Sequence, residues 1–288
     1  MAAVGALAAT ALVVLTGCGG SGSGTGDEGA ASPTRSSGPP AHSPGPAITP
    51  LPTTGAVDYQ LGGAYPPPKG VTVVERDAGD RPAPHTYSIC YVNGFQTQPD
   101  QAARWSGPRA ELLLRGSDGR PVSDPDWPGE HILDPTTPAK RAGILAVLAP
   151  VIRSCATKGF QAVEIDNLDT FTRFHRIPES ATEALARAYV RTAHAAGLAI
   201  AQKNAAESSR TARSWGFDFA VAEECHVYDE CGAYTAVYGK RVIEVEYTDN
   251  LRTPFASLCR AGNRPPLLVL RDRDLTTPAS PHYRDRTC

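Results

Sequence analysis

Apolar and polar residues alternate in short segments along the chain after residue 52, and this alternation predicts β-strands. Between the later segments lie longer stretches with helical patterns and recognisable helix ends. The eight predicted strands lie around residues 60–61 and over 71–77, 87–93, 161–166, 198–204, 217–224, 242–247 and 267–271. Eight is the strand number of a (β/α)8 barrel.

Two of the predicted helices have clear sequence boundaries. The first spans 137–159, and Pro150 is expected to kink or split it. The second follows a capping box formed by Ser180 and Glu183, and Gly197 is placed to end it. Strands that alternate with helices through short connections predict parallel pairing and right-handed crossovers.

The predicted fold is therefore α/β: a single (β/α)8 TIM-type barrel over residues 53–288 that is irregular in its first half. Residues 118–134 show no helical pattern and are expected to form a long insertion. The chain has 288 residues, and a barrel of about 250 would use almost all of it; two small domains are the alternative. The net charge is −2 and no basic stripe occurs, which argues against a nucleic-acid partner.

The N-terminal segment predicts export. Residues 1–18 form an apolar run too short to span a bilayer, and Leu15 to Cys18 resemble a bacterial lipobox, in which the cysteine is lipidated. The alternative is an ordinary secretory signal. Residues 19–52 are rich in Gly, Ser, Thr and Pro and are expected to form a disordered linker. The expected location is the outer face of the bacterial membrane, anchored through Cys18, or secretion.

The remaining six cysteines favour three disulfides in an exported protein. The absence of any C-x-x-C spacing argues against a cysteine metal site. Six cysteines allow other connectivities, so the pairing stays open. The expected pairs are Cys225 with Cys231, Cys259 with Cys288, and Cys90 with Cys155.

Carboxylates gather in the segment over residues 159–169. Alternation places Val163 and Ile165 on one face of its strand and Glu164 and Asp166 on the other. In a parallel barrel, helices cover the outer face and active sites form at the C-terminal strand ends, where Asp166 is expected. The alternative is that these acids only pair with arginines.

The same alternation predicts charge at the inner ends of the later strands. It points Phe219 and Val221 outward and Glu224 inward, and it sets Glu244 and Glu246 on the inner face of the following strand. When several acids crowd into one barrel mouth, the pKa of one carboxyl group is raised while another carboxyl group stays ionised. Glycoside hydrolysis requires such a pair of carboxyl groups. The charged residues predicted at this mouth are Asp166, Lys203, Glu223 or Glu224, and Glu246.

Other polar and aromatic residues near these strand ends are candidates for sugar binding. Aromatic side chains stack on sugar faces, although each is also explained by core or rim packing. The aromatic candidates are Tyr91, Phe95, Tyr228 and Tyr247, with Trp105 and Trp127 in loops. The predicted substrate-binding residues are Tyr91, Glu164, Asn167, Asp169, Lys203, Asn204, Glu224, Glu246 and Tyr247.

Seven ordered motifs resemble those of the endo-alpha-1,4-polygalactosaminidases, glycoside hydrolase family 114, over residues 58–249. The resemblance implies a barrel and two catalytic carboxylates, which fall on Asp166 and on Glu223. Strand alternation, in contrast, predicts that the side chain of Glu224, and not that of Glu223, points into the barrel. Residues 94–100 depart from the family pattern, because they lack its glutamate and arginine. The motifs are DYQLGG, ICYVNG, WPGEHILD, GFQAVEIDNLD, AHAAGLAIAQKN, FDFAVAEECHVYDEC and VIEVEYTD.

The leading hypothesis is an exported, endo-acting hydrolase of an amino-sugar polymer of the alpha-1,4-linked galactosamine type. It needs no cofactor or metal, and a monomer is expected. The first alternative is a non-catalytic carbohydrate-binding or wall-anchoring lipoprotein. The second is a lyase in which Lys203 forms a Schiff base with a carbonyl substrate.

Overall fold

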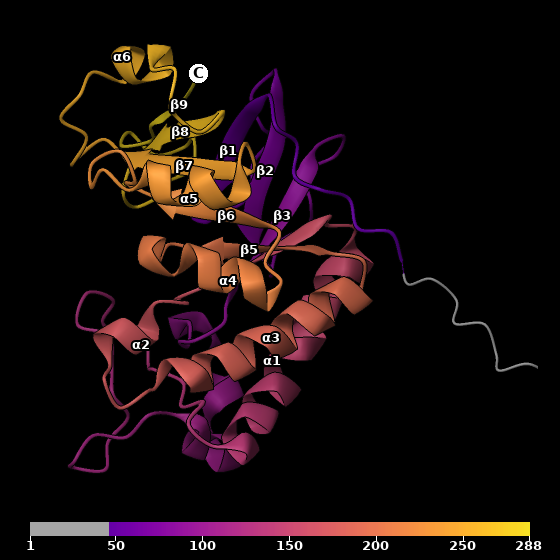
Figure 1. The fold of residues 1–288 in the computed structure, drawn as a ribbon, viewed down its shortest axis with the longest axis vertical. Helices are drawn as coiled ribbons and strands as arrows, with labels where there is room; N and C mark the ends of the chain where they lie inside the picture. The colour runs from indigo at the N-terminus through magenta and orange to yellow at the C-terminus, as the bar shows by residue number, and fades with distance from the viewer. Residues whose placement is uncertain (1–45) are drawn as a thin grey trace, which may run out of the picture. The chain divides into compact units, whose positions relative to one another are not determined.

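The structure, a computed structural model, describes residues 46–288 (Figure 1). The predicted signal peptide, the lipidation site at Cys18 and most of the predicted linker lie outside the described residues. Within the described part, residues 46–52 already pack onto the fold: the Tyr87 hydroxyl donates to the Thr49 carbonyl at 2.9 Å, and Leu51 is buried. No helix of this part is long and apolar enough to cross a membrane.

All eight predicted strands are present and form a parallel sheet in sequential order, as a TIM-type barrel requires. β1 lies beside β8, which nearly closes the barrel. A short ninth strand, β9 (Asp285–Thr287), adds antiparallel to β8 and was not predicted. The eight strands are β1 (Ala56–Gln60), β2 (Val71–Asp77), β3 (Tyr87–Asn93), β4 (Ala162–Asp166), β5 (Ala199–Lys203), β6 (Phe219–Glu223), β7 (Val242–Tyr247) and β8 (Leu267–Arg271).

Helices cover the later half of the barrel, whereas short irregular segments connect the first strands. No helix separates β1 from β2 or β2 from β3 in the described chain. The predicted insertion at 118–134 contains no helix and is held by isolated bridges such as Ser123 to His131. The helical segments are η1 (Pro99–Trp105), η2 (Gly107–Leu112), α1 (Pro138–Lys158), α2 (Thr170–Arg173), α3 (Glu179–Ala195), η3 (Ala206–Ser208), α4 (Ser209–Trp215), α5 (Cys231–Tyr238) and α6 (Phe255–Arg260).

The long helices α1 and α3 lie side by side (Figure 1). The Thr137 side chain caps α1 by accepting from the Lys140 amide at 3.2 Å. The expected split at Pro150 is wrong, because α1 continues through this residue as one helix. Gly159 ends α1 in the left-handed conformation, with φ of 100°.

The capping box predicted for α3 is also wrong. The helix begins at Glu179 after Pro178, and no side chain caps it, so Ser180 lies inside the first turn. Glu183 instead accepts from Arg187 one turn later, at 2.8 Å. The helix starts early because proline presets a backbone angle that suits a helix start. The predicted end of this helix is confirmed, because Gly197 follows it in the left-handed conformation, with φ of 80°.

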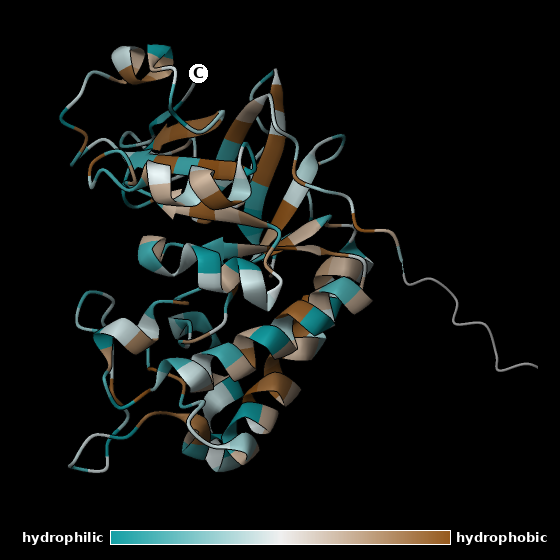
Figure 2. Cartoon of the chain, in the orientation of Figure 1, coloured by the Kyte–Doolittle hydropathy of each residue, from teal (hydrophilic) through white to brown (hydrophobic). Residues whose placement is uncertain are grey.

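The hydrophobic core has two layers, one inside the barrel and one between the strands and the helices. Figure 2 shows hydrophobic residues along β1 and β2, and hydrophilic residues on the visible side of α3. The inner layer contains Phe219, Val221, Ile243 and Val245, so the predicted orientation of β6 and β7 is wrong. Alternation shows which residues share a face, but not which face lies inside.

The residue sizes explain the actual orientation of β6. Ala220 and Ala222 belong to the outer layer with residues of the helices, where small side chains let a helix approach the sheet. The larger Phe219 and Val221 fill the barrel interior. Glu223 therefore points inward by ordinary alternation with Phe219 and Val221.

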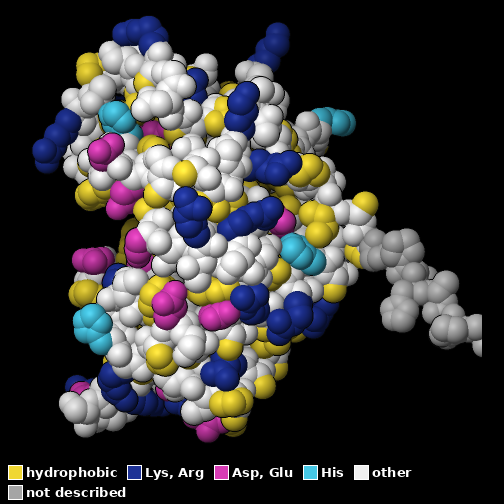
Figure 3. All heavy atoms as spheres, in the orientation of Figure 1, with side chains coloured by type: hydrophobic (Ala, Val, Ile, Leu, Met, Phe, Trp, Pro, Cys, Tyr) yellow, Lys and Arg dark blue, Asp and Glu magenta, His cyan; other side chains and the backbone are white. Residues whose placement is uncertain are grey.

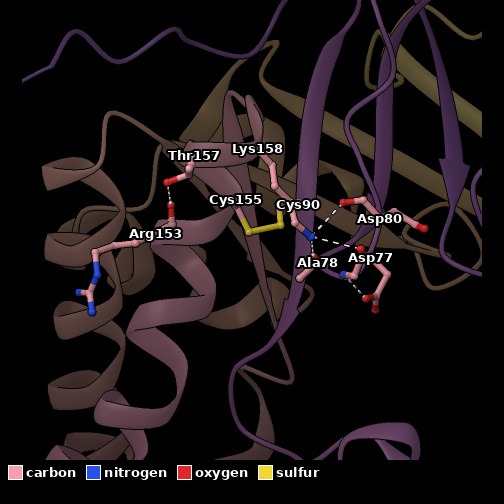
Figure 4. Close-up of a disulfide and its surroundings, with 9 residues drawn as sticks. Asp77, Ala78, Asp80, Cys90, Arg153, Cys155, Thr157 and Lys158 are labelled. Carbon is pink, nitrogen blue, oxygen red and sulfur yellow. Dashed lines mark hydrogen bonds between the residues drawn. A yellow bond between two sulfur atoms is a disulfide. The ribbon is translucent and has the colours of Figure 1, made fainter.

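The six described cysteines form three disulfides, with the pairing that the sequence analysis favoured. The bond from Cys90 to Cys155 ties β3 to α1 (Figure 4). Nearby, the Lys158 ammonium donates to the carbonyls of residues 78, 79 and 80. The remaining bonds join Cys225 to Cys231 and Cys259 to Cys288.

Candidate active site

A cavity of about 440 Å³ lies at the C-terminal ends of the strands, where TIM-barrel active sites form. Figure 3 shows acidic side chains along the edge of the molecule toward which β6 and β7 point. Both carboxylates expected to be catalytic line this cavity. The residues lining it are Tyr59, Leu61, Asp77, Tyr91, Gln98, Trp127, Glu130, Asp166, Asn167, Asp169, Arg173, Lys203, Asn204, Glu223, Glu224, Tyr247, Arg273 and Leu275.

Asp166 ends β4 and is held from three sides. Its Oδ2 accepts a hydrogen bond from the Tyr91 hydroxyl at 2.7 Å, and its Oδ1 accepts one from the Asn167 amide at 2.7 Å. Lys203 Nζ lies 3.6 Å from Oδ1. Two donors and a cation of this kind hold the carboxylate in one orientation.

Glu223 ends β6 on the other side of the same lysine. Its Oε1 accepts from the Tyr247 hydroxyl, and its Oε2 accepts from the Asn204 amide group at 3.1 Å. Asn204 also accepts from the Glu223 backbone amide at 2.8 Å, so one side chain orients both groups of this residue. Lys203 Nζ lies 3.5 Å from Oε2.

Lys203 is the only cation within 4 Å of both carboxylates among the described residues, and its side chain is 3% exposed. It also contacts Glu164 at 3.2 Å and donates to Tyr59 at 3.0 Å. Burial lowers the pKa of Lys203, but the three surrounding acids raise it more, so that it stays well above its usual value. A charged lysine is a poor nucleophile, which argues against the Schiff-base hypothesis.

Two further acids lie beneath this lysine in the barrel. Burial raises the pKa of Glu164 to about 7; Lys203 opposes this effect and Asp166 adds to it. Glu75 is fully buried on β2, and burial followed by repulsion from Glu164 raises its pKa well above the usual value. Two adjacent acids of this kind hold at least one proton near neutral pH. Glu164 thus supports the site from below and does not line the cavity.

The chain turns sharply after three of the site residues. Asn167, Asn204 and Glu224 follow the ends of β4, β5 and β6, and their φ angles are 63°, 48° and 56°. Left-handed backbone is uncommon for residues other than glycine and is found at functional sites. The turn lets the Asn167 amide bond the preceding side chain.

The structure distinguishes the two neighbouring glutamates. Glu223 points into the barrel mouth, whereas Glu224 is buried against Arg273, with contacts of 2.7 and 3.1 Å. Glu246 was wrongly placed in the site. It lies on the outer face of β7, where its Oε1 accepts from the His226 amide at 2.9 Å, and it does not line the cavity.

The predicted aromatic residues separate into exposed and buried groups. Trp127 is 58% exposed and lines the cavity, and Tyr228 is 60% exposed at an adjoining one. Phe95 packs edge-on against Tyr189, and Trp105 is buried in the outer core layer. These two contribute to the core and not to a sugar platform.

Several residues that line the cavity were not predicted from the sequence. Burial, followed by repulsion from the nearby Asp166, raises the pKa of Glu130 to about 7. Arg173 bridges Asn167 at 2.8 Å and Asp169 at 3.1 Å. The signals for these residues were weak, because Arg173 lies in a short helix. The residues missed are Tyr59, Asp77, Gln98, Glu130, Arg173 and Arg273.

One group of potential metal ligands occurs in the described chain: Cys225, Cys231 and Glu244. The two cysteines form a disulfide and therefore offer no thiolate. None of the three lines the cavity. The cavity itself is lined by carboxylates, amides, phenols and a buried ammonium, which is a set suited to acid–base chemistry.

Solved structures support this interpretation of the fold. The crystal structure of Aspergillus fumigatus Ega3 in complex with galactosamine is 17% identical, with a TM-score of 0.66, over 84% of this chain and 98% of that chain. The glycoside hydrolase domain of PelA from Pseudomonas aeruginosa is 15% identical, with a TM-score of 0.52, over 77% of this chain and 96% of that chain. A comparison with curated protein sequences finds no match. The sequence profile of glycoside-hydrolase family GH114 matches residues 39–288, and the chain belongs to this family.

Proposed function

We propose that the protein is an exported, endo-acting glycoside hydrolase that cleaves an amino-sugar polymer of the alpha-1,4-linked galactosamine type. Asp166 and Glu223 are its two catalytic carboxylates. The observation that carries the proposal is that both side chains enter one cavity, on either side of a buried lysine. Paired carboxylates across a sugar-sized cavity are the machinery of glycoside hydrolysis.

We propose that hydrolysis proceeds with retention of configuration, because both carboxylates approach the same lysine nitrogen. Asp166 Oδ1 and Glu223 Oε2 lie 3.6 and 3.5 Å from the same nitrogen of Lys203. These two oxygens are therefore separated by at most roughly 7 Å. Retaining enzymes have carboxyl groups about 5–5.5 Å apart and inverting enzymes about 6.5–9.5 Å, and the bound on the two facing oxygens is compatible with the retaining geometry.

We assign the nucleophile to Asp166, whose side chain is 18% exposed and is held by a backbone amide. Glu223, at 26%, is the acid–base residue. Asp166 attacks the anomeric carbon while Glu223 protonates the departing glycosidic oxygen, which gives a covalent glycosyl ester. Glu223 then takes a proton from water, and the water oxygen replaces Asp166 at the anomeric carbon.

The shape of the cleft supports endo action. A second cavity of about 360 Å³ adjoins the first and shares Asp169, Asn204, Glu223 and Glu224 with it. Trp127 lines the first cavity and Tyr228 the second, so each of the two adjoining cavities has an exposed aromatic ring. A polymer can therefore extend in both directions from the reacting bond.

The lining of the cleft supports an amino-sugar substrate. Glu207 and Glu230 line the second cavity, and Glu130 lines the first. None of them has a salt-bridge partner within 4 Å among residues 46–288. Uncompensated acids attract protonated amines. Gln98, in the segment that departs from the family pattern, reaches the cavity by donating to Asp77 at 3.0 Å, so this wall remains polar.

The test is incubation of the full chain with partially deacetylated galactosamine polymers, followed by mass spectrometry of the products. We expect the parent to release oligomers, and Asp166→Asn and Glu223→Gln to release at least about a thousandfold less. Glu183→Gln, on the exposed face of α3, is the matched control. Binding without release by the parent would support the carbohydrate-binding lipoprotein instead.

Proton NMR of the first products tests the stereochemistry, because retention on an alpha-linked polymer releases the alpha anomer first. Initial beta anomer would reject the assignment of Asp166 as nucleophile.

Lipid anchoring at Cys18 forms a separate part of the proposal and rests on the lipobox-like residues before it. Three disulfides in the described chain fit an oxidising compartment. We expect metabolic labelling with a fatty acid to mark the parent, and Cys18→Ala to lose the label. An unlabelled but exported parent would favour an ordinary secretory signal.

A further inference from the structure

We propose that Arg273, which follows β8, is a positioning residue that sets the charge and orientation of Glu223 through Glu224 and Tyr247. The inference rests on the proposed function of Glu223. Arg273 makes no contact with Glu223 that the structure records; it acts through the side chain that orients this glutamate and through the residue that follows it.

The first arm of this arrangement is an ion-pair clamp. The Arg273 guanidinium donates to both oxygens of Glu224, at 2.7 and 3.1 Å, and to both oxygens of Asp249, at 2.9 Å each. Asn250 adds a donor to Glu224 at 3.1 Å. The planar fork of arginine suits two carboxylates in this way, and an ammonium group does not.

The second arm is a stacked ring. The Arg273 guanidinium carbon lies 4.3 Å from the centre of the Tyr247 ring, and the hydroxyl of that ring donates to Glu223. Tyr247 is buried at the end of β7, so its ring is held between the arginine and the barrel interior. Stacking of a guanidinium on a ring fixes the direction in which the hydroxyl points.

The backbone couples the two arms. Glu224 follows Glu223 directly, has φ of 56°, and donates its amide to the Val245 carbonyl at 2.7 Å. Its side chain is thus directed away from the cavity floor and toward the end of β8. Backbone conformations of this kind persist only where the surroundings enforce them, and the contacts of Arg273 supply that enforcement.

The electrostatic consequence follows from the adjacency of two acids. Without Arg273, Glu224 would be a second negative charge beside the reacting carboxylate, and like charges disfavour ionisation. With Arg273 present, its positive charge offsets one of the two negative charges of Glu224 and Asp249. The other titratable groups that interact with Glu223 in the described chain are Tyr59, Glu164, Lys203, Tyr234 and Tyr247, and Asp166 lies on the other side of Lys203.

The test compares Arg273→Gln, Glu224→Gln and the double variant. In Arg273→Gln we expect kcat to fall about tenfold or more with a smaller change in KM, and the alkaline limb of the pH profile to move up by about 0.5–1 unit. The double variant removes both charges together, so its alkaline limb returns toward that of the parent. Arg273→Lys keeps the charge and is expected to restore the pH profile better than it restores kcat.

A substrate-free measurement separates this inference from the proposed function. We expect carbon-detected NMR to show the Glu223 carboxyl carbon titrating at higher pH in Arg273→Gln than in the parent, and near the parent value in the double variant. Arg187→Gln, which breaks an exposed pair on α3, is the control and shifts nothing. If Arg273→Gln lowers the melting temperature but leaves the titration and the pH profile unchanged, Arg273 is only a structural tie and the inference is wrong.

Discussion

The barrel buries two groups of acids, and only one of them holds a cation. Inside the barrel, Glu164 lies 3.2 Å from the buried Lys203, which also contacts both proposed catalytic carboxylates. On the outer face of β7, Glu244 and Glu246 are fully buried, and no lysine or arginine lies within 4 Å of either among the described residues. Both groups are surrounded by the same fold, but only the inner one has a buried cation beside it.

The pKa values reflect this difference. Burial, followed by repulsion from Glu246, raises the pKa of Glu244 to about 8. Burial raises the pKa of Glu246 to about 7, against the opposing hydrogen bond from the His226 amide. The outer pair therefore holds a proton near neutral pH with no cation beside it, whereas in the inner group the charge of Lys203 lowers the pKa of Glu164 against the effect of burial.

The largest expected effect comes from removing that lysine. Lys203→Met leaves three carboxylates around an apolar side chain, and breaking a buried ion pair costs about 3–5 kcal/mol. We expect urea unfolding at pH 7 to show this loss, and hydrolysis to fall by at least about a hundredfold. The loss should shrink as the pH falls, because protonation removes the uncompensated charges.

The double variant Lys203→Met/Glu164→Gln sharpens this test. It removes one of the uncompensated charges, and we expect it to recover part of the stability but none of the activity. If Lys203→Met unfolds at the same urea concentration as the parent, the lysine does not balance the inner acids.

The next largest effect belongs to the outer pair and has the opposite sign. A carboxyl group whose pKa is raised in the folded state holds its proton more tightly there than in the unfolded chain. Its contribution to the free energy of unfolding is therefore full at low pH, and this contribution is lost as the pH rises toward about 8. Glu244→Gln removes this loss, so we expect the variant to gain about 1–3 kcal/mol over the parent at pH 8 relative to pH 5.

Urea unfolding at the two pH values measures this gain, with Glu183→Gln as an exposed control. Activity at pH 7 should stay near that of the parent, since neither outer acid lines the cavity. If the stability of Glu244→Gln depends on pH as strongly as that of the parent, Glu244 is not the cause of the pH dependence.

The sequence predicted the barrel well because strand alternation and helix boundaries are local signals. Asp166 and Lys203 lie at inner strand ends as expected, with the larger Val163 and Ile165 in the outer layer and the small Ala199 and Ala201 in the inner one. The orientation of β6 and β7 could not be predicted in this way. Both faces of a barrel strand are buried, so alternation alone does not tell Glu223 from Glu224.

The ion pairs of Arg273 could not be predicted from local sequence patterns, for a different reason. Its partners Glu224 and Asp249 lie 49 and 24 positions earlier in the chain, and only the closing of the barrel brings them together. No local pattern in the sequence shows which acids pair with Arg273. Contacts between distant strand ends depend on register and on the number of strands, which a single sequence does not encode locally.

The smallest effect concerns the two exposed aromatic rings, which extend the comparison from the inner acids to the rim above them. We expect Trp127→Ala to raise KM for a long polymer about tenfold and to change kcat little, because the ring binds sugar away from the reacting bond. Trp105→Phe, in the buried core layer, is the matched control and leaves KM unchanged. Tyr228→Ala should shift product lengths instead, since Tyr228 lines the adjoining cavity, which Glu223 also lines. Equal losses in kcat and kcat/KM for Trp127→Ala would place this ring at the transition state and contradict its assignment to the rim.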